Sequence, residues 1–272
     1  MLLGYNTNGL QNHRLDDALR LVADKGFQAV ALTPDVCHLD PMSCSAAEVR
    51  RTAALLERLG LAVVVETGAR FVLDPAIKHE PTLMTRDHDA RERRLDFYGR
   101  CAEIGRDLGA EVLSFWSGVD RDPGPDSQEW LRDGVARTCE AVVARGLRPA
   151  MEPEPGMAVG TVAEFEAVAA SLGAGAPALC LDIGHLYVTG EAEPDAIIAA
   201  HAGRLAQVHI EDMVRGVHEH LPPGEGDVDF AAVRGALERH GYEGPVCFEL
   251  SRSSHCAPAA MDLCMAAWTP AD

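Results

Sequence analysis

The sequence predicts an α/β protein with the (β/α)₈ TIM barrel fold, formed by a single domain over residues 1–272. Strand-like and helix-like segments alternate along the chain without a break, and they make eight pairs. A barrel of this kind usually takes about 250 residues, which agrees with the length of the chain. No linker or low-complexity stretch divides the sequence, so we expect one domain rather than two.

The first four units follow from apolar spacing and from helix-end signals. We expect strands at 2–6, 29–33, 61–67 and 111–116, followed by helices at 15–26, 45–60, 91–109 and 129–146. In the second unit, Ser45 and Glu48 have the spacing of a capping box, and Gly60 lies just beyond the helix end. A long loop, residues 68–89, separates the third strand from its helix.

The last four units repeat the pattern with short, strongly apolar strands. We expect these strands at 147–152, 178–182, 205–210 and 245–250, and their helices at 161–173, 194–203, 229–241 and 258–268. In a parallel barrel, the carboxyl ends of the strands form the rim where binding and chemistry take place.

Composition excludes several classes of protein. No apolar run reaches the roughly 18 residues that a membrane helix needs, and the start, MLLGYNTNGL, has no basic region typical of a signal peptide. We therefore expect a cytoplasmic protein. The eight cysteines fall mostly inside expected strands and helices without a CxxC pair, which favours reduced thiols over disulfides.

The charge balance argues against a nucleic-acid partner. The chain has 24 Lys and Arg residues against 42 Asp and Glu residues, a formal net charge of −18. Affinity for nucleic acid comes largely from cations that neutralise phosphates, so we expect no nucleic acid and no membrane among the partners. Whether the chain is a monomer or a homodimer is left open.

Four potential metal ligands stand at the ends of the last four expected strands: Glu152, Asp182, His209 and Glu249. Taken singly, such a carboxylate is more often a helix cap, and such a histidine is more often part of the core. Capping does not explain four successive strands that end in this way. Carboxylate and imidazole groups together suit one divalent cation.

This ligand order resembles the xylose-isomerase-like barrel superfamily, together with DIGH at 182–185 and PGEGDVDF at 223–230. That group includes sugar epimerases and isomerases, inosose dehydratases and family-2 apurinic-site endonucleases. The resemblance implies that the four residues bind Mn, Zn, Mg or Co, and that Glu152 and Glu249 are the catalytic acid and base. It implies an isomerase or epimerase that acts through an enediolate on a small polyhydroxylated substrate: a sugar, sugar phosphate or cyclitol.

Three alternatives remain on the same barrel. The enediolate could instead expel a hydroxyl, which would make the protein a lyase such as a keto-cyclitol dehydratase. Two ions would favour a dinuclear hydrolase or an oxygenase. A barrel that binds metal without catalysis is the non-enzymatic alternative.

A second ion is suggested by three histidines, His185, His218 and His220. In the endonuclease branch, an acid-x-His pair before GEG binds an additional ion together with the DxxH histidine. Here His218 stands in place of the acid, so one or two ions per chain are both open. Alternatively, His185 binds a substrate oxygen, and His218 and His220 are loop residues.

Other side chains near the rim are candidates for substrate binding. Arg70, Lys78 and His79 are cations of the long loop that could bind a phosphate or carboxylate, and Arg252 follows the last strand. Trp116 is a candidate wall for a sugar ring, although it could equally be core packing.

One feature differs from the free-ketose 3-epimerases of the superfamily. Those enzymes carry a second glutamate six residues after the first metal ligand, where this chain has Ala158. Glu154 lies nearby at a different spacing.

Overall fold

The computed structural model describes residues 1–269, which form a closed parallel barrel with its strands in sequence order. The strands are β1 (Leu2–Asn6), β2 (Ala29–Leu32), β3 (Ala62–Thr67), β4 (Val112–Phe115), β5 (Arg148–Met151), β6 (Ala178–Asp182), β7 (Leu205–Ile210) and β8 (Pro245–Phe248). The barrel closes where β1 pairs with β8, with Leu2 opposite Pro245 and Tyr5 opposite Phe248. The predicted (β/α)₈ fold is confirmed.

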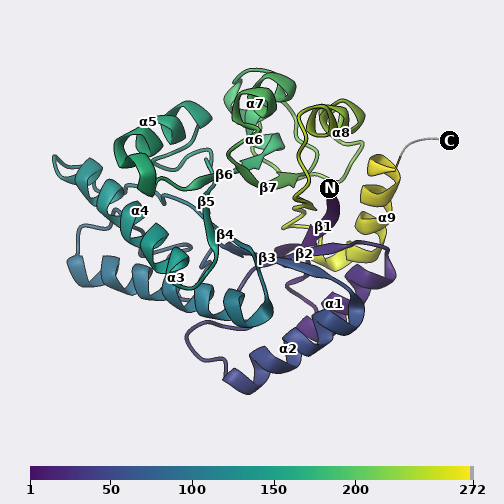
Figure 1. Cartoon of the computed structure of the whole chain (residues 1–272), viewed down its shortest axis with the longest axis horizontal. Coiled ribbons are helices and arrows are strands. Elements are labelled where there is room, and N and C mark those ends of the chain that lie inside the picture. Colours follow the sequence, from purple (N-terminus) through teal and green to yellow (C-terminus); the bar gives the residue numbers. More distant parts are fainter. Residues whose placement is uncertain (270–272) are drawn as a thin grey trace.

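The α-helices surround the strands, as Figure 1 shows. They are α1 (Leu15–Asp24), α2 (Ala46–Leu59), α3 (His88–Leu108), α4 (Ser127–Val143), α5 (Val162–Leu172), α6 (Ile183–Thr189), α7 (Pro194–His201), α8 (Phe230–Arg239) and α9 (Ala257–Trp268). Short 3₁₀ helices lie at η1 (Thr7–Leu10), η2 (Gly173–Gly175) and η3 (Ser254–Cys256). The ion pair between Lys25, after α1, and Asp262, in α9, joins the two ends of the ring of helices.

Most expected elements lie within a few residues of their observed bounds, and the capping signals explain why. Ser45 and Glu48 form the reciprocal capping box at the start of α2, and Gly60 ends that helix in the left-handed conformation at φ 67°. Helix α6 was not expected, because its residues were assigned to a loop between the sixth strand and the helix at 194. Asp182 caps α6 by accepting a hydrogen bond from the backbone N–H of His185.

Small side chains from the strands fill the interior of the barrel. One buried cluster consists of Ala31, Val64, Val112, Ala150, Cys180, Ala206 and Cys247. At Gly4, an added Cβ would lie 2.5 Å from Sγ of Cys247, so β1 and β8 approach too closely there for any side chain. The larger apolar side chains pack between the barrel and the helices. Polar side chains are buried at the carboxyl rim.

An irregularity in β7 sets the position of His209. Leu205 pairs with Leu179, but Gln207 pairs with Cys180, so that Ala206 is an additional residue in β7 relative to β6. Beyond this shift, His209 lies opposite Asp182. Without it, Val208 would occupy that place, and the imidazole would be displaced from the carboxylates.

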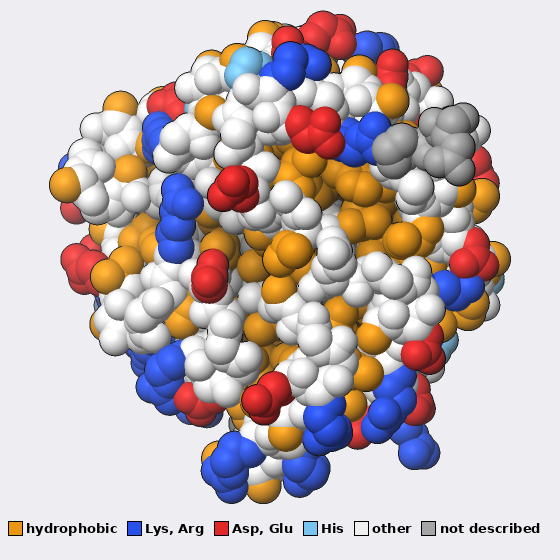
Figure 2. Space-filling model, turned by 45° about the vertical axis from the view of Figure 1, so that its right-hand side comes forward, with side chains coloured by type: hydrophobic (Ala, Val, Ile, Leu, Met, Phe, Trp, Pro, Cys, Tyr) orange, Lys and Arg blue, Asp and Glu red, His pale blue; other side chains and the backbone are white. Residues whose placement is uncertain are grey.

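The remaining expectations concern thiols, membrane helices and surface charge. All eight cysteines, which lie within residues 1–269, are free thiols. Within that part of the chain, no helix is both long enough and apolar enough to cross a membrane. On the face shown in Figure 2, Lys and Arg side chains are interspersed with Asp and Glu around a hollow of apolar atoms.

Candidate active site

The four predicted metal ligands meet in one buried cluster at the carboxyl rim. One ligand atom from each of Glu152, Asp182, His209 and Glu249 lies within 4.8 Å of the others. Nδ1 of His209 is 3.1 Å from Oε1 of Glu152 and 3.0 Å from Oε2 of Glu249. Glu152 and Glu249 directly follow β5 and β8, whereas Asp182 and His209 are still inside their strands.

Hydrogen bonds from neighbouring strands fix two of the carboxylates. Nδ2 of Asn6 donates to Oε2 of Glu249 at 3.1 Å, and Nδ2 of Asn8 donates to Oε1 at 2.8 Å. Nε1 of Trp116 donates to Oε2 of Glu152 at 2.8 Å. These donors leave each carboxylate little freedom to rotate, which is the usual task of groups that surround metal ligands.

The imidazole of His209 is oriented by Gln207, its neighbour on the same side of β7. The side-chain amide of Gln207 lies 2.5 Å from Nε2 of His209. The contacting atom is the amide nitrogen, Nε2 of Gln207, which donates to Nε2 of His209, so Nδ1 carries the proton toward Glu152 and Glu249. A cation bound between the carboxylates would take the place of this Nδ1 proton.

The charge of the site also fits a bound cation. Glu152, Asp182 and Glu249 are almost fully buried, and Oδ2 of Asp182 has no hydrogen-bond partner among residues 1–269. Burial alone would raise the pKa of Glu249, but the hydrogen bond and charge of His209, with the charges of His220 and His185, hold it well below its usual range. Three carboxylates and one imidazole are a donor set suited to Mn, Zn, Mg or Co.

The three additional histidines form a second cluster beside the first. Ring nitrogens of His185, His218 and His220 lie within 4.8 Å of one another. Nδ1 of His185 is 3.0 Å from the carbonyl of Pro153, and a carbonyl only accepts, so the imidazole donates there and keeps Nε2 free. The structure thus brings these three residues together, and their role as ligands remains a proposal.

Two glutamates that the sequence analysis did not assign to the site complete this second cluster. Oε2 of Glu154 is 3.5 Å from Nε2 of His185, and Oε1 is 3.6 Å from Nε2 of His218. Oε2 of Glu211 is 3.6 Å from Nδ1 of His220. Burial raises the pKa of Glu154 to about 7 and that of Glu211 to about 8. The HIED segment at 209–212 was a signal for Glu211, since Glu211 directly follows the strand that contains His209.

A third unassigned glutamate, Glu66, lies across the barrel in β3. It is 1% exposed, and its Oε2 accepts a hydrogen bond from Oγ1 of Thr33 at 2.5 Å. Burial, and then the negative charge of Glu249, raise the pKa of Glu66 to about 8. The sequence signal for Glu66 was its position in the apolar run LAVVVET, because such a run is typical of a fully buried strand, in which a charged residue is unusual.

A polar cavity of about 280 Å³ opens above these groups, and its size suits a small molecule. The wall includes Glu249, Glu154, His218 and His220, together with four of the predicted substrate contacts, Lys78, His79, Trp116 and Arg252, and also Arg70. Arg252 donates to Oε1 of Glu219 at 2.7 Å, so it already has a carboxylate partner. Trp116 both lines the cavity and holds Glu152.

His79 differs from its prediction as a cation. Burial, reinforced by the positive charge of Lys78, lowers the pKa of His79 to about 3. Its Nδ1 donates to the carbonyl of Gly68, and its ring packs edge-on against Trp116 with centroids 5.0 Å apart. His79 is therefore a neutral part of the cavity wall, and the long loop contributes only Arg70 and Lys78 to the wall as cations.

The long loop is packed onto the rim and is not a solvated insertion. Leu73, Thr82, Leu83 and Met84 are buried, although the loop contains no regular secondary structure. The fully buried Arg94 in α3 donates to the carbonyl of His79 and to the hydroxyl of Tyr98. These contacts hold the loop in place over the cavity.

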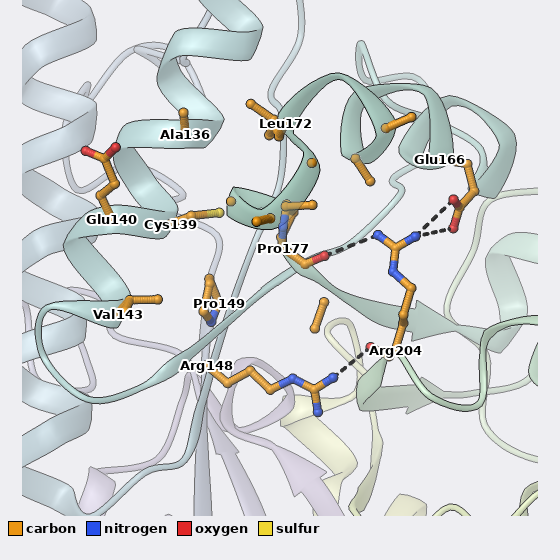
Figure 3. Close-up of a pocket in the computed structure, with 17 residues that line it drawn as sticks. Ala136, Cys139, Glu140, Val143, Arg148, Pro149, Glu166, Leu172, Pro177 and Arg204 are labelled. Atoms are coloured by element: carbon orange, nitrogen blue, oxygen red, sulfur yellow. Dashed lines mark hydrogen bonds and ion pairs between the residues drawn. The ribbon is translucent and has the colours of Figure 1, made fainter.

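A larger cavity of about 840 Å³ lies elsewhere, between α4, α5 and the amino ends of β5 and β6. Its lining is mostly small and apolar, and the guanidinium of Arg204 is already paired with both oxygens of Glu166 (Figure 3). It lies at the opposite ends of the strands from the four-residue cluster, so the smaller polar cavity is the candidate active site.

Comparisons with known proteins agree with this architecture. The family model for the xylose isomerase-like TIM barrel matches residues 19–265. L-ribulose-5-phosphate 3-epimerase UlaE of Shigella flexneri serotype 5b (strain 8401) is 25% identical over 248 residues, which cover 90% of this chain and 84% of that protein.

Two solved structures share the fold at lower identity. D-allulose 3-epimerase from Methylomonas sp. superimposes with a TM-score of 0.78 at 18% identity, over 98% of this chain and 96% of that one. The IOLI protein with a zinc atom superimposes with a TM-score of 0.77 at 17% identity, also over 98% and 96%. Since the family model covers most of the sequence, the chain belongs to the xylose isomerase-like TIM barrel family.

Proposed function

We propose that the protein is a divalent-metal-dependent epimerase of a small ketose or ketose phosphate, acting at the carbon next to the carbonyl. The observation that carries this proposal is the arrangement of Glu152 and Glu249. The two carboxylates come from strands β5 and β8, and both reach the same nitrogen of His209 inside the four-residue cluster. Two carboxylates fixed at the ends of different strands can act on one bound substrate as base and acid.

The chemistry follows from these positions. A divalent cation held by Glu152, Asp182, His209 and Glu249 would polarise the substrate carbonyl and stabilise the negative charge of the enediolate. One of the two glutamates removes the proton from the carbon beside the carbonyl. The other returns a proton to the opposite face, which inverts that carbon. Asn6, Asn8 and Trp116 hold both carboxylates in place during the exchange.

The relatives support an epimerase among the enzymes that this barrel accommodates. UlaE is described as a 3-epimerase of L-ribulose 5-phosphate, and the Methylomonas protein as a 3-epimerase of D-allulose. The second glutamate of free-ketose 3-epimerases is missing at Ala158, but Glu154 lines the cavity. We propose that Glu154 makes the corresponding substrate contact. The cytoplasmic location remains a prediction, and the choice between a monomer and a homodimer stays open.

The proposal is tested by proton exchange in deuterated water. We expect protein that contains about one equivalent of Mn, Zn or Co to incorporate deuterium into at least one of D-allulose, L-ribulose and L-ribulose 5-phosphate. NMR detects the exchange and the epimer together. Exchange without a new epimer would indicate an isomerase or a lyase, and no exchange with any ketose would refute the proposal.

Glu249→Gln provides the residue-level test. The amide cannot accept the proton, so we expect exchange to be abolished while the thermal unfolding midpoint changes little. Glu111→Gln is the matched control, because Glu111 directly precedes β4 at the opposite end of the barrel. Unchanged turnover in Glu249→Gln would remove Glu249 from the mechanism.

A dinuclear hydrolase is the second candidate, and the cluster of His185, His218 and His220 favours it. Asp182 belongs to the first cluster and also to a group with Glu211 and His220, so it could bridge two ions. Elemental analysis separates the candidates. About two equivalents of zinc or iron per chain would favour an activated bridging water over enediolate chemistry.

A further inference from the structure

The side of the cavity formed by β1, β2 and β3 contains a carboxyl oxygen without a partner. Glu66 lines the cavity, and Thr33 binds its Oε2, but its Oε1 has no hydrogen-bond partner among residues 1–269. An added Cβ at Gly68 would lie 3.5 Å from this atom, so the oxygen borders the short turn that leads into the long loop. A buried polar atom of this kind requires a partner, and a bound ligand is one way to supply it.

A second free oxygen lies on the same side. Asn8 is largely buried, and its Nδ2 is committed to Glu249, which directs the other end of the amide. Its Oδ1 has no hydrogen-bond partner in the described part of the chain. Asn8 also lines the cavity. Glu66 and Asn8 thus place two free accepting oxygens on this side, neither of them in the four-residue cluster, and Nη1 of Arg70 in the same cavity also has no hydrogen-bond partner within residues 1–269.

We infer that Glu66 is a specificity-determining residue whose Oε1 hydrogen-bonds a hydroxyl on the part of the substrate remote from the reacting carbon. This inference rests on the proposed function. It names a substrate that carries a free hydroxyl at that carbon, in preference to a hydrogen atom or a phosphate in the same place.

Hydrogen-bond chemistry explains the choice of a hydroxyl. A hydroxyl donates to Oε1 when Glu66 is ionised and accepts from it when Glu66 is protonated, so the pair forms in either state. A phosphate dianion can bond to Oε1 only while Glu66 is protonated and is repelled by the ionised carboxylate, and no lysine or arginine within residues 1–269 donates a hydrogen bond to Glu66. A phosphate elsewhere on the substrate remains compatible, because Arg70 and Lys78 line the same cavity.

The test compares a ketose with analogues that each lack one hydroxyl. The probes are D-allulose and its 4-, 5- and 6-deoxy forms, given to the metal-loaded full-length protein. We expect one of the deoxy forms to lower kcat/KM by at least about tenfold in the wild type. Glu66→Leu should lower kcat/KM for D-allulose by a similar factor and should no longer distinguish it from that analogue. Glu66→Gln retains a polar atom and should keep most of the discrimination.

Metal content and binding provide readouts that do not depend on turnover. Glu66→Leu should retain the wild-type metal content, and Glu111→Leu should behave as the wild type in every assay. Dissociation constants for the same sugars, measured by calorimetry, should show the same ratios as kcat/KM.

The outcomes separate the two proposals. Binding with wild-type discrimination but without proton exchange would refute the epimerase while supporting the role of Glu66. Turnover with unchanged discrimination in Glu66→Leu would refute only the role of Glu66. Failure of the wild type to bind D-allulose, L-ribulose and L-ribulose 5-phosphate would refute both.

Discussion

Replacing Trp116 by Phe removes one hydrogen bond from the candidate metal site and little else. The indole Nε1 donates to Oε2 of Glu152 at 2.8 Å, and this is the hydrogen bond that the oxygen receives. The ring also packs edge-on against His79. Phe preserves an aromatic ring at that contact, so the substitution isolates the donor.

The magnitude follows from the nature of this bond. A hydrogen bond to a charged group contributes about 1.5 to 3 kcal/mol, and each 1.4 kcal/mol corresponds to a factor of ten in an equilibrium constant. Loss of a group that orients a metal ligand typically weakens metal binding by about 10-fold to 100-fold. Both values correspond to metal binding that is weaker by about 10-fold to 100-fold. Water entering from the cavity can replace part of the bond, so we expect the lower half of this range, about 10-fold to 30-fold.

The assay is a competition titration of Mn²⁺ or Zn²⁺ against a chromophoric chelator, with thermal unfolding measured in parallel. Trp130→Phe is the control, because Trp130 lies on α4 and packs under Arg91, away from the cluster. An unchanged metal dissociation constant in Trp116→Phe would show that the indole does not hold Glu152 for a cation.

Three further substitutions test other parts of the structure. Lys78→Ala should raise KM mainly for phosphorylated ketoses, and an equal rise for neutral ones would refute a phosphate contact. His218→Ala should leave activity largely intact if one ion suffices, whereas loss of one metal equivalent would establish the second site. Burial lowers the pKa of His38 in the folded protein. As the pH falls below about 6.5, His38 therefore becomes protonated in the unfolded chain before it does so in the folded chain, which lowers the free energy of unfolding. His38→Gln should therefore make the fall in unfolding free energy between pH 7 and pH 5 shallower, and an identical slope in urea titrations would contradict this.

The sequence by itself determined the barrel and the residues of the first cluster. Alternating apolar segments and capping pairs such as Ser45 and Glu48 are local signals, because they depend on spacing along one strand or one helix. Since parallel strands bring their carboxyl ends to one rim, Glu152 and Glu249 could be placed together before any contact was known. Helix α6 was not predicted because it is short and begins at Ile183, directly after the last residue of β6.

Only the tertiary structure decided how the site is completed. Glu66, Glu154 and Glu211 join it through contacts between residues distant in the sequence, and the strand patterns around Glu66 and Glu211 did not identify those partners. The neutral state of His79 depends on its burial where the long loop packs against Trp116, which the sequence does not encode in any single motif. The position of His209 depends on the additional residue in β7, which becomes evident only when two strands are paired. Strand ends are thus fixed by local patterns, whereas protonation, register and the partners of buried polar atoms are set by the packing of the whole barrel.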